Sequence, residues 1–480
     1  MHTDLAAPAA AAPGTAPWRP SVAVGVAVVL LAGFAALAPA AGPSVGRLVV
    51  GACLVGLVVV QYTVDWRALV VALAAWLVLL GLVRRLLNEV TVRPNADPLL
   101  IVAPVALGLL TVAAIRSGGL TRRSTLTTGV LALDVLTLLE SANLSQVPLV
   151  ASIAALLFVL VPQLAFWVGR ALPDATLRAL LRVIAGLALG AAAYGLLQTY
   201  VGFFPWDRNW ADQSATRYSA LNVSGTIRAF GTSASAAEYA YLLAIGIVCW
   251  LVVRPASRLA TGAAVAVLVA ALVLESSRGP VVVLVAALVL VAAARYGVRG
   301  GTALVLTALI AILVPLVASF LVPHTDATSD TSRLLAHQAE GLANPFDPRT
   351  STLLGHLSLV GTGLASAVHH PFGLGVGVIT IATKFGGSYT QSEADVSNVA
   401  MAFGLVGVVI FLVVFCLALS RAYRTARLTR SPLALATLGI LIVTTNQWLN
   451  GGMYAVAWLP WLVLGWLDRT AGINPGEEDT

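Results

Sequence analysis

The chain is dominated by uninterrupted apolar runs, mostly of Ala, Val and Leu, each about 20 residues long and so matched to the thickness of a bilayer. Inside a bilayer the backbone finds no water to bond, so such runs cross it as helices. Charged residues make up only 10% of the chain, against about 25% in soluble domains. The pattern predicts an all-α, polytopic integral membrane helix bundle, and it excludes soluble, disordered, coiled-coil and disulfide-rich secreted proteins.

Polar breaks divide the apolar sequence into candidate spans, and we expect a bundle of about 12–14 transmembrane helices. Residues 1–20 are predicted to be a flexible cytoplasmic tail, and residues 469–480 a second one. Transmembrane helices are predicted over 21–322 and 397–468. The candidate spans are 21–41, 46–63, 67–83, 98–116, 123–140, 146–168, 176–200, 234–254, 257–275, 279–296, 301–322, 397–420, 432–449 and 452–468.

The distribution of positive charge predicts the orientation. With a cytoplasmic amino terminus, most of the 28 basic residues fall on short cytoplasmic segments, as the positive-inside rule requires. The pair Arg84–Arg85, at an outer helix end, is an exception. This orientation places two long hydrophilic segments, 201–233 and 323–396, on the external side. Because positive charge follows this rule, it gives no reason to expect nucleic acid as a partner.

The segment 323–396 holds five of the six histidines. Loops of this length are usually functional or disordered, and this one has too many apolar residues for disorder. The stretch from Thr331 to His337 begins like a capped short helix. Residues 352–368 are predicted to form a helix that lies at, or dips into, the outer membrane face. We therefore expect any chemistry to be external.

Two arginines are candidates for binding a phosphate group. Arg228 and Arg278 each lie at a predicted outer membrane boundary, where a guanidinium keeps its charge and matches phosphate oxygens bidentately. Together they would suit a membrane-anchored diphosphate. The alternative is that each reaches the interface or pairs with Glu238 or Glu275.

Other polar residues of the external segment give weaker signals. Gly373, Gly375 and Gly377 predict a tight turn that lets the backbone approach a substrate or another helix. His369–His370 lacks a third ligand at helical spacing, so we expect neither a metal site nor a cofactor. Glu393 is the first candidate for a general base, and it would need burial to raise its pKa. Further candidates for this role are His356, His370 and Asp395.

Asp134 lies inside an apolar run, and ionisable residues at such positions are frequently functional. A transporter or lipid flippase would explain both this residue and the many spans. The alternative for Asp134 is a hydrogen-bonded contact between helices. Transporters commonly show internal repeats, and the sequence has no convincing repeat.

Several motifs, taken in order, resemble the O-antigen ligase and polymerase superfamily (the Wzy and WaaL group) of bacterial envelope glycosyltransferases. The resemblance covers roughly residues 220–420. The matching pieces are Arg228-x-x-Gly231-Thr232, Ser277-Arg278-Gly279, Arg349, His356, His370-Pro-Phe-Gly-Leu-Gly-Val-Gly377, and Glu393 eleven residues before Gly404-Leu-Val-Gly407.

The resemblance implies a GT-C-like architecture in the bacterial cytoplasmic membrane. It also implies transfer of a glycan from a polyprenyl diphosphate to an acceptor glycan at the outer face, with release of the lipid diphosphate. Arg228 and Arg278 would then hold the diphosphate. Ligases of the family tend to carry His at the position of Glu393, so the resemblance favours a polymerase of a surface polysaccharide and leaves a ligase open.

Overall fold

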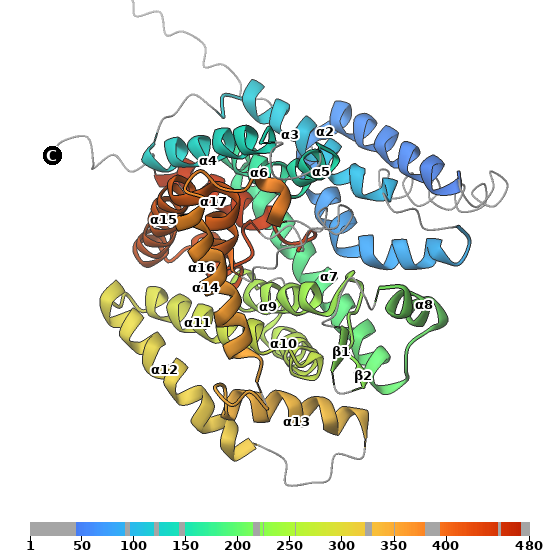
Figure 1. Cartoon of the computed structure of the whole chain (residues 1–480), viewed down its shortest axis with the longest axis vertical. Coiled ribbons are helices and arrows are strands. Elements are labelled where there is room, and N and C mark those ends of the chain that lie inside the picture. Colours follow the sequence, from blue (N-terminus) through green and yellow to red (C-terminus); the bar gives the residue numbers. More distant parts are fainter. Residues whose placement is uncertain are drawn as a thin grey trace, which may run out of the picture.

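The described part of the computed structural model comprises residues 45–91, 97–119, 124–143, 149–214, 221–223, 225–254, 256–321, 329–349, 351–379, 394–449 and 453–471. The predicted first span 21–41, the predicted tail 1–20, residues 472–480 of the predicted tail 469–480, and Glu393 lie outside these ranges. The described chain is almost entirely helical (Figure 1), as the apolar runs predict.

The first half of the described chain forms seven α-helices, one 3-10 helix and a short two-stranded antiparallel ribbon. These elements are α2 (Gly46–Asn88), η1 (Pro98–Ile101), α3 (Val102–Arg116), α4 (Thr125–Ser141), α5 (Leu149–Phe158), α6 (Leu160–Ala171), α7 (Asp174–Tyr200), α8 (Pro205–Ser214), β1 (Asn222–Val223) and β2 (Thr226–Ile227).

The second half carries the central helix and the external helices. Its elements are α9 (Ala236–Val253), α10 (Arg258–Glu275), α11 (Arg278–Arg295), α12 (Gly300–Leu321), α13 (Asp330–Ala343), α14 (Leu353–His369), η3 (Val376–Ile379), α15 (Asp395–Thr429), α16 (Pro432–Val443) and α17 (Trp458–Ala471).

Seven helices of the described chain are long and apolar enough to cross a membrane, which confirms a multi-pass membrane protein. They are α2, η1 with α3, α7, α9, α10, α11 and α15. The predicted total of about 12–14 also counts α2 twice and includes shorter helices. The double count has a structural basis, because the backbone of Asp65 is extended (φ −158°, ψ 101°) and divides α2 between the predicted spans 46–63 and 67–83.

The core of the bundle is built around α9. In α9, 89% of the most apolar stretch of 18 residues is buried, against 39–56% of the corresponding stretch in the other long helices. It packs against α7, α10, α11 and α16 (Figure 1). The outer helices instead leave large apolar side chains exposed, such as Leu304 (63%) and Val409 (62%). Such exposure suits helices whose outer faces contact lipid.

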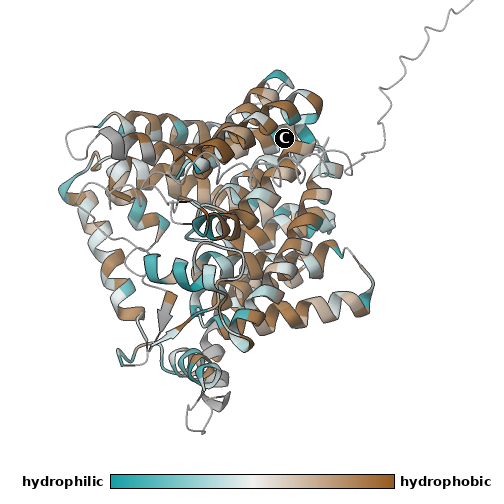
Figure 2. Ribbon diagram, turned by 90° about the vertical axis from the view of Figure 1, so that its right-hand side faces the viewer, coloured by the Kyte–Doolittle hydropathy of each residue, from teal (hydrophilic) through white to brown (hydrophobic). Residues whose placement is uncertain are grey.

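Several helix ends contact each other, and the sequence assigns the two ends of each contact to the same side of the membrane. On the predicted inner side, Asp468 of α17 forms ion pairs with Arg170 (3.4 Å) and Arg421 (2.8 Å). On the predicted outer side, Arg85 of α2 pairs with Asp207 of α8 at 3.1 Å. In Figure 2 most of the helical ribbon is hydrophobic. The alternation of loops expected from sequence is therefore consistent with the observed contacts.

The last two predicted spans, 432–449 and 452–468, are helical over shorter lengths than expected. α16 ends at Val443 and α17 begins at Trp458. Two buried carboxylates accept the backbone N–H groups of the intervening turns: Asp395 from Trp448 (2.7 Å) and Leu449 (3.1 Å), and Glu238 from Ala455 (2.7 Å). Backbone this deep in a bundle is tolerated when its polar groups find such partners.

Helix α15 is interrupted at Gly404, where φ is +64° and ψ is −157°. The segment 371–375 fits into the interruption, with Leu374 and Gly375 donating to the carbonyls of Met401 and Ala402, and Leu405 donating to that of Pro371. A Cβ at position 404 would lie 2.0 Å from the Pro371 carbonyl oxygen. The glycine-rich stretch that begins at His370 therefore brings backbone against another helix, one of the two alternatives predicted for it.

The predicted external segment contains two helices, α13 and α14. α13 begins beside the expected position, with the Ser329 side chain capping it. α14 packs its small residues Gly363 and Ala367 toward α15 and leaves Leu357 (51%) and Val368 (71%) exposed. Figure 1 shows α14 running from α13 toward α15 and α16. Such an apolar, exposed helix is suited to a membrane surface.

Candidate functional site

Three segments that are far apart in sequence meet at the predicted outer end of the bundle. The strand β2 leads to Arg228, the turn between α10 and α11 carries Glu275 to Arg278, and α13 lies across that turn. Hydrogen bonds join α13 to both other segments, because Thr226 Oγ1 donates to Asp330 (3.3 Å) and Ser276 Oγ to the Leu334 carbonyl (3.1 Å). We call Arg228, Glu275, Ser277, Arg278 and His337 the outer arginine site.

The turn between α10 and α11 is shaped by Glu275, whose side chain is fully buried. Its two carboxylate oxygens accept the backbone N–H (2.9 Å) and the hydroxyl (2.7 Å) of Ser277. Ser276 takes a left-handed conformation (φ +69°) between them. The turn therefore fixes Arg278 as the first residue of α11, beside the position of Arg228.

The Arg228 guanidinium is buried, with 12% of the side chain exposed. Its Nη1 donates to Ser277 Oγ at 3.2 Å and lies 3.8 Å from Glu275 Oε1. Its Nε is buried and has no hydrogen-bond partner within the described part of the chain. A buried donor without a partner is costly, so an anionic ligand that reached this N–H would offset that cost.

Arg278 is held by α13. Its Nη2 donates to the His337 carbonyl (2.8 Å) and lies 3.1 Å from Nε2 of the same residue. The guanidinium rests against Gly341, where an added Cβ would lie 1.7 Å from Cζ. Glycine at 341 therefore leaves the space that Arg278 occupies.

The outer arginine site is electropositive. Burial and the charges of Arg278 and Arg228 lower the pKa of His337 to about 4, so the imidazole is neutral at pH 7. Burial also lowers the pKa of Arg228, and the carboxylate of Glu275 opposes that shift. Arg228 has the buried Glu275 as its acidic neighbour, whereas the charge of Glu340 acts on Arg278. This arrangement favours an anion with several oxygen acceptors.

The residues predicted as candidate bases lie in different places. His356 is exposed near the start of α14 and contacts Thr352 Oγ1 at 3.1 Å. His370 is exposed at the other end, about 20 Å away along the helix axis at 1.5 Å per residue. Asp395 is buried, and its carboxylate holds Trp448 and Leu449. Glu393 lies outside the described residues, and Arg349 is exposed.

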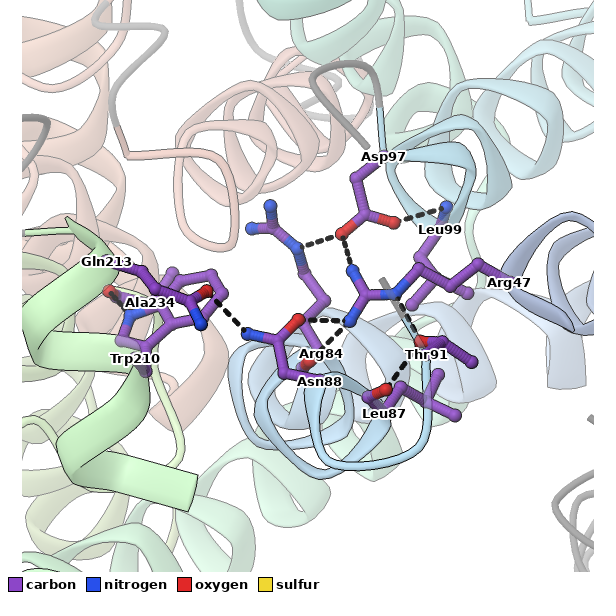
Figure 3. Close-up of polar contacts among 10 residues, drawn as sticks. All are labelled: Arg47, Arg84, Leu87, Asn88, Thr91, Asp97, Leu99, Trp210, Gln213 and Ala234. Atoms are coloured by element: carbon purple, nitrogen blue, oxygen red, sulfur yellow. Dashed lines mark hydrogen bonds and ion pairs between the residues drawn. The ribbon is translucent and has the colours of Figure 1, made fainter. Parts of the chain in front are cut away.

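A second group of arginines at the same end of the bundle directly contacts buried carboxylates (Figure 3). Arg47 and Arg84, from the two ends of α2, both bond Asp97 Oδ2, at 2.8 Å and 2.7 Å. Arg47 also donates to Thr91 Oγ1 (3.0 Å) and to Asn88 Oδ1. The Arg84 guanidinium lies 5.0 Å from the ring of Trp210. This arrangement ties the two halves of α2 together.

Arg85 connects this second group to the outer arginine site. Its side chain is fully buried, pairs with Asp207, and donates to the carbonyls of Gly231 and Ser233. From the other side, Gln198 Oε1 accepts the N–H of Gly231 at 2.8 Å. The Gly231–Thr232 part of the sequence motif is therefore anchored to α2 and α7, and this anchoring positions Arg228.

Asp134 makes a hydrogen-bonded contact between helices. Its Oδ2 accepts from Trp167 Nε1 of α6 at 2.9 Å, and one turn further along α4 Thr137 Oγ1 accepts from Gln163 Nε2 at 3.3 Å. Asp134 Oδ1 and Gln163 Oε1 are buried without partners in the described structure. These four residues form a polar seam inside an apolar part of the bundle.

No sequence pattern singled out His337, Gly341 or the Ser277 hydroxyl as parts of the site. The available signal was the concentration of histidines in the external segment and the capped helix that begins near Thr331. Within the described ranges, no three His, Cys, Asp or Glu side chains gather as metal ligands would.

The fold and this site define a multi-pass, all-α membrane protein with a cationic cluster at one end of its helices. A comparison of the sequence with models of known families and with curated proteins finds no match to either.

Proposed function

We propose that this protein is a glycosyltransferase that acts at the outer face of the bacterial cytoplasmic membrane. The donor is a glycan linked to a polyprenyl diphosphate, and the acceptor is the terminal sugar of a growing surface polysaccharide. The product is a longer chain, so the enzyme is a polymerase.

One observation carries this proposal: Arg228 and Arg278, from segments far apart in sequence, converge with a buried, unused N–H on Arg228. A lipid diphosphate presents its charge at the depth of a membrane boundary. When the acceptor oxygen attacks the anomeric carbon, the bond between that carbon and the diphosphate oxygen breaks. The diphosphate leaves with the electron pair, and preorganised guanidiniums stabilise the developing charge.

The acceptor hydroxyl loses its proton to a general base. Glu393 remains the first candidate, with His356 and His370 behind it. Asp395 is a weaker candidate, because its carboxylate already accepts two backbone N–H groups. His337 is neutral at pH 7, so its imidazole adds no positive charge to the site. The backbone carbonyl of His337 accepts a hydrogen bond from Arg278 and so orients that side chain. The arginines neutralise the leaving group without a metal ion.

The test uses purified protein reconstituted with a polyprenyl-diphosphate oligosaccharide, followed by measurement of longer glycan and released lipid diphosphate. Arg228→Ala and Arg278→Ala should each reduce turnover by about 100-fold or more. Arg333→Ala, which removes an exposed arginine of α13, is the matched control and should keep wild-type turnover. Wild-type activity in both site variants would overturn the proposal.

A ligase that moves the finished glycan to a different acceptor uses the same donor chemistry. The two are distinguished by the glycan that accumulates on lipid when the protein is deleted. Single repeat units indicate a polymerase, whereas long unattached chains indicate a ligase. Mass spectrometry of the extracted lipid-linked glycan gives this answer directly.

A transporter or lipid-glycan flippase is a second candidate function, and the polar seam at Asp134 is the observation that favours it. A proton relay needs an ionisable side chain with an unused acceptor inside the bundle. Asp134→Asn should stop such a relay and should leave an external glycosyl transfer unchanged. Measuring both activities in the same reconstituted variant separates the two functions.

A further inference from the structure

A cavity of about 440 Å³ lies at the end of the bundle opposite to the outer arginine site. It is formed where α9 and α11 end and where α15 turns into α16. Its volume falls within the roughly 300–1,000 Å³ typical of small-ligand pockets. The lining residues are Val252, Arg254, Arg295, Tyr296, Arg430, Pro432 and Leu435.

The cavity carries three positive charges, from Arg254, Arg295 and Arg430, and no acidic residue lines it. None of the three arginines forms an ion pair with another described residue. Other arginines at this end of the bundle have carboxylate partners: Asp468 pairs with both Arg170 and Arg421. The cavity therefore differs from the Asp468 cluster at the same end, where a buried carboxylate compensates two arginines.

Two of these arginines have unfavourable backbone conformations. Arg254 (φ +48°) and Arg430 (φ +51°) are left-handed residues directly after α9 and α15. Glycine is the usual residue at such a position, because any side chain makes the left-handed conformation costly. Non-glycine residues of this kind cluster at ligand-binding positions. The sequence thus keeps two arginines facing one cavity where glycine would be more stable.

We infer that this cavity binds the phosphate group of an anionic phospholipid from the leaflet opposite to the outer arginine site. Guanidinium groups bind phosphate oxygens bidentately. Basic pockets between transmembrane helices commonly hold lipid head groups. The apolar Val252 and Leu435, and the ring of Tyr296 (79% exposed), provide contact for a lipid at the membrane boundary. On the predicted orientation this is the cytoplasmic leaflet.

The test titrates purified full-length protein in detergent with phosphatidylglycerol, phosphatidylcholine or inorganic phosphate, and measures binding by native mass spectrometry and the shift in Tm. The double variant Arg254→Gln with Arg295→Gln removes two charges from the cavity. The control double variant, Arg178→Gln with Arg258→Gln, removes two exposed arginines from the predicted same side. Both variants have the same net charge.

Phosphatidylglycerol should bind wild type and the control with equal affinity, and the cavity variant at least about tenfold more weakly. Arg430→Gly should raise Tm without lipid, because it relieves the left-handed residue, and should also weaken phosphatidylglycerol binding. Equal binding of inorganic phosphate and phosphatidylglycerol would support the site but identify free phosphate as its source. Unchanged phosphatidylglycerol affinity in both the double variant and Arg430→Gly would overturn the inference.

Discussion

Two groups of arginines occupy the same end of the helix bundle, and they differ in how their charge is compensated. Arg47, Arg84 and Arg85 face the carboxylates of Asp97 and Asp207 at 2.7–3.1 Å. Arg228 has one acidic neighbour, Glu275, at 3.8 Å. In the first group Arg84 and Arg85 also lie over aromatic rings, whereas each group donates to backbone carbonyls.

The comparison separates arginines that hold the fold together from arginines that are available to a ligand. Removing one partner of a buried ion pair leaves an uncompensated charge, so the first group cannot give up its contacts to a ligand. In the outer arginine site, Arg228 lies 3.8 Å from its carboxylate neighbour Glu275, so its charge is less closely compensated. The four predictions below test this division.

The largest effect is expected for Arg85→Ala. The change leaves Asp207 buried without its ion pair and frees the carbonyls of Gly231 and Ser233. We expect a loss of about 3–5 kcal/mol of stability, measured as lower yield and lower Tm of the purified protein. Arg228→Ala should lower Tm less, because its carboxylate neighbour Glu275 lies farther away (3.8 Å) and also accepts the N–H and hydroxyl of Ser277. A variant at Arg85 that is as stable as wild type would remove the distinction between the two groups.

Gly341→Ala should separate stability from activity. In a helix interior, alanine is favoured over glycine by about 1 kcal/mol, but here its Cβ would displace the Arg278 guanidinium. We expect unchanged or higher Tm and a loss of about 100-fold in glycan transfer. Gly262→Ala in α10 is the control, since its Cβ would meet open space. Full transfer activity at Gly341→Ala would show that Arg278 does not need its observed position.

Glu275→Gln should strengthen anion binding at the outer arginine site. The amide keeps an oxygen for the Ser277 N–H and removes the negative charge beside Arg228. We expect inorganic pyrophosphate to bind about tenfold more tightly, measured by isothermal titration. Asp212→Asn is the control, because Asp212 is exposed on α8 and its charge is screened by solvent. Weaker binding after the Glu275 change would contradict the assignment of this site to anions.

The smallest effect concerns pH. The pKa of His337 is about 4 in the folded protein, against 6.5 for a solvated histidine, so the unfolded chain takes up a proton first as the pH falls. His337 therefore contributes stability fully above pH 6.5, and this is lost as the pH approaches 4. The side chain is partly exposed, so we expect on the order of 1 kcal/mol. Thermal unfolding across this range should show a smaller pH dependence in His337→Gln than in wild type.

The sequence was sufficient to predict the fold class, because uninterrupted apolar runs allow only membrane-spanning helices. It was insufficient to locate the interruptions. Gly404 breaks α15 because the segment 371–375 supplies new hydrogen-bond partners. α16 ends early because Asp395 accepts the freed N–H groups from across the bundle. Both interruptions depend on residues distant in sequence, and no local pattern indicates such partners.

The candidate site was predictable to a similar extent. The flanking apolar sequence placed Arg228 and Arg278 at helix boundaries on one side, but the contact between Arg278 and His337 requires α13 to fold across the turn that begins α11. The exception to the positive-inside rule, Arg84–Arg85, is explained by buried partners. Charge counting does not detect such neutralisation.

The segment lodged in the interruption of α15 has a consequence for engineering the protein. Residues 371–375 complete the hydrogen bonding of α15, so α14 and α15 should be exchanged together in a chimeric protein. A chimera that exchanged 329–379 alone would have to reproduce the backbone path of 371–375 for its N–H groups to reach the carbonyls of Met401 and Ala402. An exchange that also included α15 would carry both halves of the junction. An exchange of the external segment with that of another protein should therefore extend through α15 and end after Thr429.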